Sequence, residues 1–145
     1  MAFRFSLASV LSFRESIEKR EELALQKVQL EVARVLRSID KLTADLIDAL
    51  DARDRALQTP TPAFYLQGMQ EEMAAAILAK QNLSATLQSL KREREKQIAV
   101  YQAAHRNREL LTDLLTQQKN TWEQKQLKTQ QKSLDDIFAA RAQRE

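Results

Sequence analysis

The sequence predicts an all-α protein, a long antiparallel two-helix coiled-coil hairpin with arms of unequal length. Its 145 residues include one Gly and no Cys, and the strong helix formers Ala, Leu, Gln, Lys, Arg and Glu dominate. Apolar residues recur at spacings of three and four on both sides of a single break. That break holds the only two prolines, Pro60 and Pro62, which a helix interior does not tolerate.

The first helix is expected from about residue 7 to 58. A stripe starts with Leu7, Val10, Leu11, Arg14 and Ile17, and an eleven-residue step to Val28 predicts a locally relaxed supercoil. Steps of four and three then follow, as in the a and d positions of a coiled coil. These later members are Val28, Val32, Val35, Ile39, Leu42, Leu46 and Ala49.

After a turn at about 59–62, the second helix is expected from about residue 63 to 140, within a single coiled-coil domain that spans the chain. Polar members of its stripe, such as Arg94 and His105, are of the kind that fixes register. The stripe runs through Met69, Met73, Ala76, Lys80, Leu83, Leu87, Leu90, Arg94, Ile98, Tyr101, His105, Arg108, Leu111, Leu115, Gln118 and Trp122.

The two predicted arms differ in length, so the second helix is expected to extend past the first. A turn at residue 60 pairs residues whose numbers add to about 120, which leaves residues beyond about 114 without an intramolecular partner. This unpaired end contains Trp122 and an apolar group formed by Leu134, Ile137 and Phe138. An unpaired apolar face is a candidate contact surface; the alternative is a frayed, idle tail.

The composition argues against an enzyme and against a cofactor or metal site. A phosphate-binding loop needs several glycines, and Gly68 is alone. His105 is the only histidine and there is no cysteine, so a paired metal site is not expected. The net charge of +3 is a small excess typical of a solvated helix surface.

Two further features bear on location. The longest apolar stretch, residues 73–79, is too short to span a bilayer, so direct membrane insertion is not expected. The first thirteen residues superficially resemble a signal peptide, but no convincing small-residue cleavage site follows them. The expected compartment is the cytoplasm.

The two ends of the chain carry recognisable motifs. They are the opening Ala2-Phe3-Arg4-Phe5, the pairs Val10-Leu11 and Arg14-Glu15, and the ending at residues 131–141, QKSLDDIFAAR. With these motifs the chain resembles the FliJ family of the bacterial flagellar export apparatus. Asp136 stands where the family often has Glu. The resemblance implies an antiparallel two-helix coiled coil, similar to the central stalk of rotary ATPases, that acts without catalysis.

The resemblance also implies partners: the hexameric export ATPase, the cytoplasmic part of the export gate membrane protein, and export chaperones. The chain would be a monomer associated peripherally with the inner membrane through the export apparatus. The implied gate surface is Met69, Met73, Ala76 and Lys80, although a plain seam beside the turn explains these residues equally well. The implied ATPase surface comprises Phe3, Phe5, Leu11, Arg14, Trp122, Leu134, Asp135, Asp136, Ile137 and Phe138.

Three alternatives remain from the residues alone. The chain could be the equivalent stalk of a virulence type III secretion injectisome, which differs in cargo more than in physical character. It could be a homodimeric coiled-coil scaffold in which the two prolines only kink a longer helix. A basic helical nucleic-acid binder is the third, and its binding would weaken steeply with salt.

Overall fold

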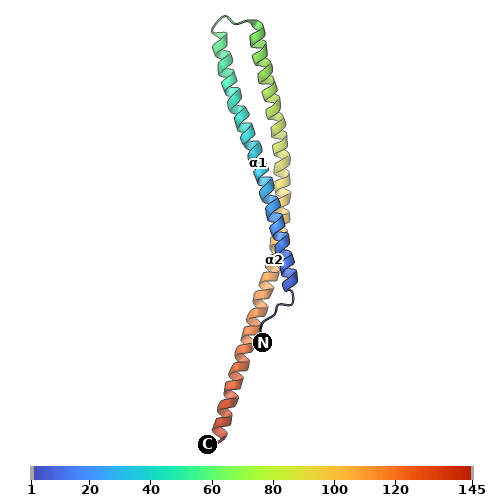
Figure 1. The fold of residues 1–145 in the computed structure, drawn as a ribbon, viewed down its shortest axis with the longest axis vertical. Coiled ribbons are helices and arrows are strands. Elements are labelled where there is room, and N and C mark those ends of the chain that lie inside the picture. The colour runs from blue at the N-terminus through green and yellow to red at the C-terminus, as the bar shows by residue number, and fades with distance from the viewer. Residues whose placement is uncertain (1, 145) are drawn as a thin grey trace. The chain divides into compact units, whose positions relative to one another are not determined.

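A computed structural model describes residues 2–144, which form two long antiparallel helices, α1 (Ala8–Leu57) and α2 (Ala63–Arg144) (Figure 1). The predicted all-α hairpin is confirmed. Contacts divide the chain into two compact units. We call Glu21–Val100 the turn unit, and Met1–Arg20 together with Tyr101–Glu145 the terminal unit.

The two prolines lie in the turn between the helices. The last turn of a helix leaves carbonyl groups without intrahelical partners. Here the Thr61 hydroxyl donates to the Ala56 carbonyl over 2.6 Å, which satisfies one of them. The carbonyl of Pro62 then accepts a hydrogen bond from the Tyr65 amide at 3.1 Å and starts α2. The chain therefore reverses through side-chain capping and without any residue of positive φ among those described.

In the turn unit, the predicted seam is where the helices meet. Val32 and Val35 are 4% and 5% exposed, and the remaining predicted seam positions of both helices in this unit are half-buried. The eleven-residue step before Val28 contains a polar contact. Gln97 donates from its side-chain amide to the carboxylate of Glu21 at 2.7 Å and to the Glu21 carbonyl at 3.1 Å.

The terminal unit has a polar cluster in its seam. Arg108 donates from Nε to Glu18 Oε2 at 2.6 Å and from Nη2 to Oε1 at 3.5 Å, while its Nη1 donates to Thr112. His105 Nδ1 lies 3.4 Å from Glu18 Oε1, and its ring stacks on Tyr101. The guanidinium hydrogen bond holds the pKa of Glu18 below its ordinary value and raises the pKa of Arg108. The polar side chains of this seam are thus paired across the two helices.

Three details of the predicted stripe and its end are wrong. Val10 and Gln118 are exposed, so they lie outside the seam. The unpaired end does not start at about residue 114, because Phe3 packs on Trp122. The prediction assumed that the first arm begins where its helix begins, at about residue 7. Residues 2–5 form neither helix nor turn, and an extended residue spans about 3.3 Å where a helical one spans about 1.5 Å, so this segment reaches further along α2 than a helix of the same length.

The Glu18 contact predicts a pH dependence of stability. A carboxylate whose folded pKa is lowered stabilises the fold above its unfolded pKa of about 4.3, and this contribution disappears as the pH falls through the folded value. We expect Glu18→Gln to melt at a lower temperature than the unmodified chain at pH 7, and the two melting curves to converge below about pH 4. Thermal unfolding followed by circular dichroism measures the difference.

Glu31→Gln is the matched control for this measurement. Glu31 bonds Arg34 at 2.8 Å on the same helix, but both side chains are largely in water, and exposed ion pairs contribute little. The control should therefore melt like the unmodified chain at either pH. A difference between Glu18→Gln and the unmodified chain that stays constant from pH 7 to pH 3 would contradict the assigned ion pair.

Candidate interaction surfaces

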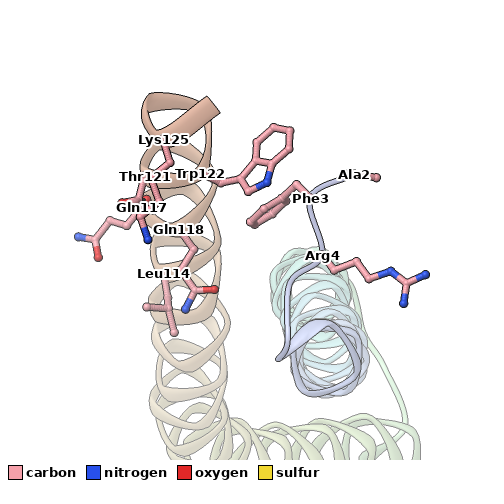
Figure 2. Close-up of a pocket in the computed structure, with 9 residues that line it drawn as sticks. All are labelled: Ala2, Phe3, Arg4, Leu114, Gln117, Gln118, Thr121, Trp122 and Lys125. Carbon is pink, nitrogen blue, oxygen red and sulfur yellow. The ribbon is translucent and has the colours of Figure 1, made fainter. Parts of the chain in front are cut away.

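The N-terminal strap, residues 2–7, packs on α2 within the terminal unit. Phe3, Phe5 and Leu7 are half-buried, and the residues between them are exposed. Residues 6 and 7 form a turn in which the Ala8 amide donates to the Phe5 carbonyl at 3.2 Å. The ring of Phe3 lies 5.9 Å from that of Trp122 at an interplanar angle of 54°, a tilted arrangement favourable for aromatic pairs. Figure 2 shows the two rings facing each other. The structure thus brings two predicted ATPase-binding residues together.

A cleft of about 480 Å³ lies between the strap and α2. Phe3 and Trp122 stand at its edge, and the Arg4 side chain extends away from α2 (Figure 2). The other residues that line it are Ala2, Leu114, Gln117, Gln118, Thr121 and Lys125. The cleft is open, and its lining combines amides, hydroxyls and apolar groups with the cations Arg4 and Lys125, so it is suited to contacts with a partner.

The ten predicted ATPase-binding residues do not form one continuous surface. Leu11 and Arg14 are half-buried on α1 beside the seam. The residues from Leu134 to Phe138 are exposed and lie more than ten residues beyond Trp122 on α2. The strap with Trp122 and the distal group are therefore separate candidate surfaces within the terminal unit.

We define the overhang as residues 123–144 of α2. Every described residue of the overhang except Gln126 is exposed, including Leu134 (55%), Ile137 (48%) and Phe138 (63%). The sequence reasoning missed Leu127, which is 65% exposed. It lies seven residues before Leu134, so heptad spacing places both on one face and is the signal that would have found it.

The positive charge of the chain is concentrated at this end. Residues 114–145 contain six lysines and arginines against four acidic residues, a net charge of +2, and Arg4 in the strap adds one more positive charge. Residues 5–113 contain sixteen of each sign and are neutral. Lys125, Lys128 and Lys132 follow each other at spacings of three and four, so they share one face of the helix. The basic pI of 9.3 therefore reflects one end of the protein.

The four predicted gate-binding residues, Met69, Met73, Ala76 and Lys80, lie in the turn unit. All four are half-buried, on the side of α2 that faces α1. Near them, Phe64 and Tyr65 are 77% and 55% exposed, and sequence reasoning assigned no role to either. The periodic pattern could not have found these two aromatic residues, because they lie off the stripe.

Metal-binding groups and membrane-spanning segments are both absent from residues 2–144. No group of three or more His, Cys, Asp or Glu side chains between residues 2 and 144 could hold a metal ion. Neither α1 nor the described part of α2 contains an apolar stretch long enough to cross a bilayer. The features that stand out are exposed apolar side chains on helices, which are typical of protein contacts.

Comparison with known proteins identifies the family. The model of the flagellar FliJ protein family matches residues 3–145, nearly the whole chain. The chain belongs to the FliJ family. The family is associated with flagellar protein export. No curated protein and no solved structure matches the chain.

The strap contact can be tested in solution with the only tryptophan of this FliJ-family chain, Trp122. Phe3→Ala removes the ring that covers it, so we expect a red-shifted emission and stronger quenching by acrylamide. The helix content from circular dichroism should stay the same, because residue 3 lies outside both helices.

The control is Phe138→Ala, which removes an exposed aromatic ring from the same helix as Trp122 but sixteen residues away. This variant should emit like the unmodified chain. If Phe3→Ala also leaves the emission unchanged, the strap does not pack on Trp122 in solution.

Proposed function

We propose that this FliJ-family chain is a non-enzymatic stalk of the flagellar type III export apparatus that links the hexameric export ATPase to the export gate. The observation that carries the proposal is the family match over residues 3–145, joined to a helix end whose apolar side chains face solvent. In this role the protein works in the cytoplasm and also assists export chaperones. The flagellar description of the family favours this role over that of an injectisome stalk.

The overhang is the best-supported surface for the ATPase. It is a single helix of about 33 Å at 1.5 Å per residue, narrow enough to enter a ring. Burial of Leu134, Ile137 and Phe138 would contribute a few kcal/mol. Asp135 and Asp136 flank these residues and could pair with basic side chains of a ring, although exposed pairs add little.

The strap and Trp122 are the second element of this proposed ATPase surface. Phe3 and Trp122 keep the start of α1 close to α2 just before the overhang begins. Ordering an interface costs conformational entropy, and a contact already formed in the free protein reduces that cost. We propose that Leu11 and Arg14, which are half-buried behind the strap, support this end and do not provide the main contact area.

The early part of α2 is proposed as the gate surface. Met69, Met73, Ala76 and Lys80 are only half-buried, so part of each side chain remains accessible beside α1. Methionine adapts its shape to different surfaces, which suits a contact that forms and dissociates. The same residues stabilise the helix pair, and any test of gate binding must separate the two effects.

Truncation after Lys125 tests the ATPase proposal while keeping the Phe3–Trp122 contact. Removing the remaining residues deletes few intramolecular contacts, so the thermal midpoint should change little. Stimulation of ATP hydrolysis by a purified cognate export ATPase should be lost. Leu134→Asp with Phe138→Asp in the full chain should weaken the stimulation at least tenfold, since burial of a charge without a partner is costly.

The matched control is Leu23→Asp with Leu30→Asp, which replaces two leucines that are 53% and 68% exposed on α1. It carries the same change of charge and should stimulate the ATPase normally. A truncated chain that stimulates hydrolysis at the same concentration as the full chain would exclude the overhang from the mechanism.

Met69→Asp with Met73→Asp tests the gate proposal. We expect affinity for the purified cytoplasmic domain of a cognate gate protein to fall at least tenfold, because the contact would desolvate two unpaired carboxylates. The helical circular dichroism signal should remain nearly intact, although the melting temperature should fall. Leu78→Asp, at a position 58% exposed, is the control and should bind normally. If the double variant unfolds, these methionines serve the seam and not the gate.

A further inference from the structure

The turn unit carries a second heptad stripe that the intramolecular seam does not use. On α1 the seam includes Val35, Ile39, Leu42, Leu46 and Ala49. The residues one position after them, at 36, 40, 43, 47 and 50, follow each other at steps of four and three, as in a seam. The apolar and hydroxyl members of this second stripe are Leu36, Thr43, Ile47, Leu50 and Leu57.

The second stripe faces solvent. Ile47 is 55% exposed, Leu57 60%, and Leu36 and Leu50 about 40%. One residue corresponds to a rotation of about 100° on a helix. A helix with two heptad stripes about 100° apart can pack on two neighbours at once, as helices in bundles do. In the turn unit, α1 has only one neighbour, α2, among the described residues.

The matching face of α2 carries a single charge. Residues 73–90 contain one charged residue, Lys80, which is half-buried. Because the two right-handed helices run antiparallel, residues one position after each seam residue fall on the same face of the pair. On α2 these are Ile77, Gln81, Ser84 and Gln88, which line a groove of about 510 Å³ together with Leu46, Ala85 and Lys80. A surface with one charged residue costs less to desolvate than a densely charged one.

The charges beside this groove indicate the chemistry of the occupant. Two positions of the second stripe on α1 are acidic, Asp40 and Asp54, fourteen residues or two heptads apart. Asp54 lies 3.9 Å from an Arg53 nitrogen and remains 67% exposed, while Asp40 has no ion pair within residues 2–144. A second copy would bring aspartates or uncharged residues to these positions. Lysines or arginines would complement them.

From this arrangement we infer that the second stripe and the groove beside it bind one amphipathic helix of a partner protein, whose apolar stripe is flanked by basic residues two heptads apart. The bound helix covers Ile47, Leu50 and Ile77 and brings its cations to Asp40 and Asp54. The complex is a three-helix bundle over the turn unit. This surface lies beside the proposed gate residues on α2 and does not depend on the proposed function.

Two designed peptides test the inference. Each is a 28-residue amphipathic helix with a leucine heptad stripe, and the two differ only at a flanking pair of positions fourteen apart, which hold lysine in one and glutamate in the other. Fluorescence anisotropy with the full chain at low salt measures binding. We expect the lysine peptide to bind one to one and the glutamate peptide to bind at least tenfold more weakly.

Variants of the chain locate the peptide. Ile47→Glu with Leu50→Glu should weaken binding of the lysine peptide at least tenfold. Leu23→Glu with Leu30→Glu, at positions 53% and 68% exposed elsewhere on α1, should bind it normally. Asp40→Asn with Asp54→Asn should abolish the preference for the lysine peptide. Circular dichroism of each variant verifies that the helices form.

Three results would overturn the inference. The first is that neither peptide binds, or that both bind equally to the unmodified chain. The second is that Ile47→Glu with Leu50→Glu leaves the affinity for the lysine peptide unchanged. The third is that the unmodified chain is a dimer in analytical ultracentrifugation and the same double variant is a monomer. That result would assign the stripe to a second copy.

Discussion

Two helices packed against each other can shield only one narrow stripe on each, and the rest of this structure depends on that limit. Of the residues described, only Val32, Val35 and Ala104 are less than a tenth exposed. Fold stability is therefore spread along the seam in many half-buried contacts, each worth a fraction of what a fully buried side chain contributes. Large apolar residues outside the stripe have no place to be buried and remain on the surface.

A seam of this kind does not determine its own register. Shifting one helix by a heptad exchanges similar apolar residues and changes little buried area, so polar contacts have to distinguish the correct alignment. Glu18 with Arg108 in the terminal unit, and Glu21 with Gln97 in the turn unit, are contacts of this kind. Leaving either carboxylate half-buried without its partner would be costly, which disfavours shifted pairings.

The sequence predicted the hairpin, the position of the turn and most of the seam, because prolines and heptad spacing are local signals. It recognised Arg108 and His105 as polar seam positions but could not identify Glu18 as their partner, since a partner eighty or more residues away depends on the exact register. It also misjudged where the unpaired end begins. A periodicity argument treats every residue as helical, and the strap is not helical.

The candidate surfaces also differ in how far the sequence could predict them. The exposed triplet Leu134, Ile137 and Phe138 followed from arm length alone, but the contact between Phe3 and Trp122 required the path of a non-helical segment. The early residues of α2 were expected to form either a gate surface or a plain seam, and their half-burial is compatible with both. Periodicity identifies an apolar face of a helix, but it does not identify whether that face contacts the other helix or a partner protein.

The uneven charge described for the terminal unit has a kinetic consequence. Since residues 5–113 are neutral, the long-range field of the protein comes mainly from the lysines and arginines near the end of α2. A partner with an acidic opening would attract that end during diffusion, so productive encounters would be enriched before any contact forms. The orientation of approach, and its sensitivity to ionic strength, would then be set by about thirty residues that take little part in the fold.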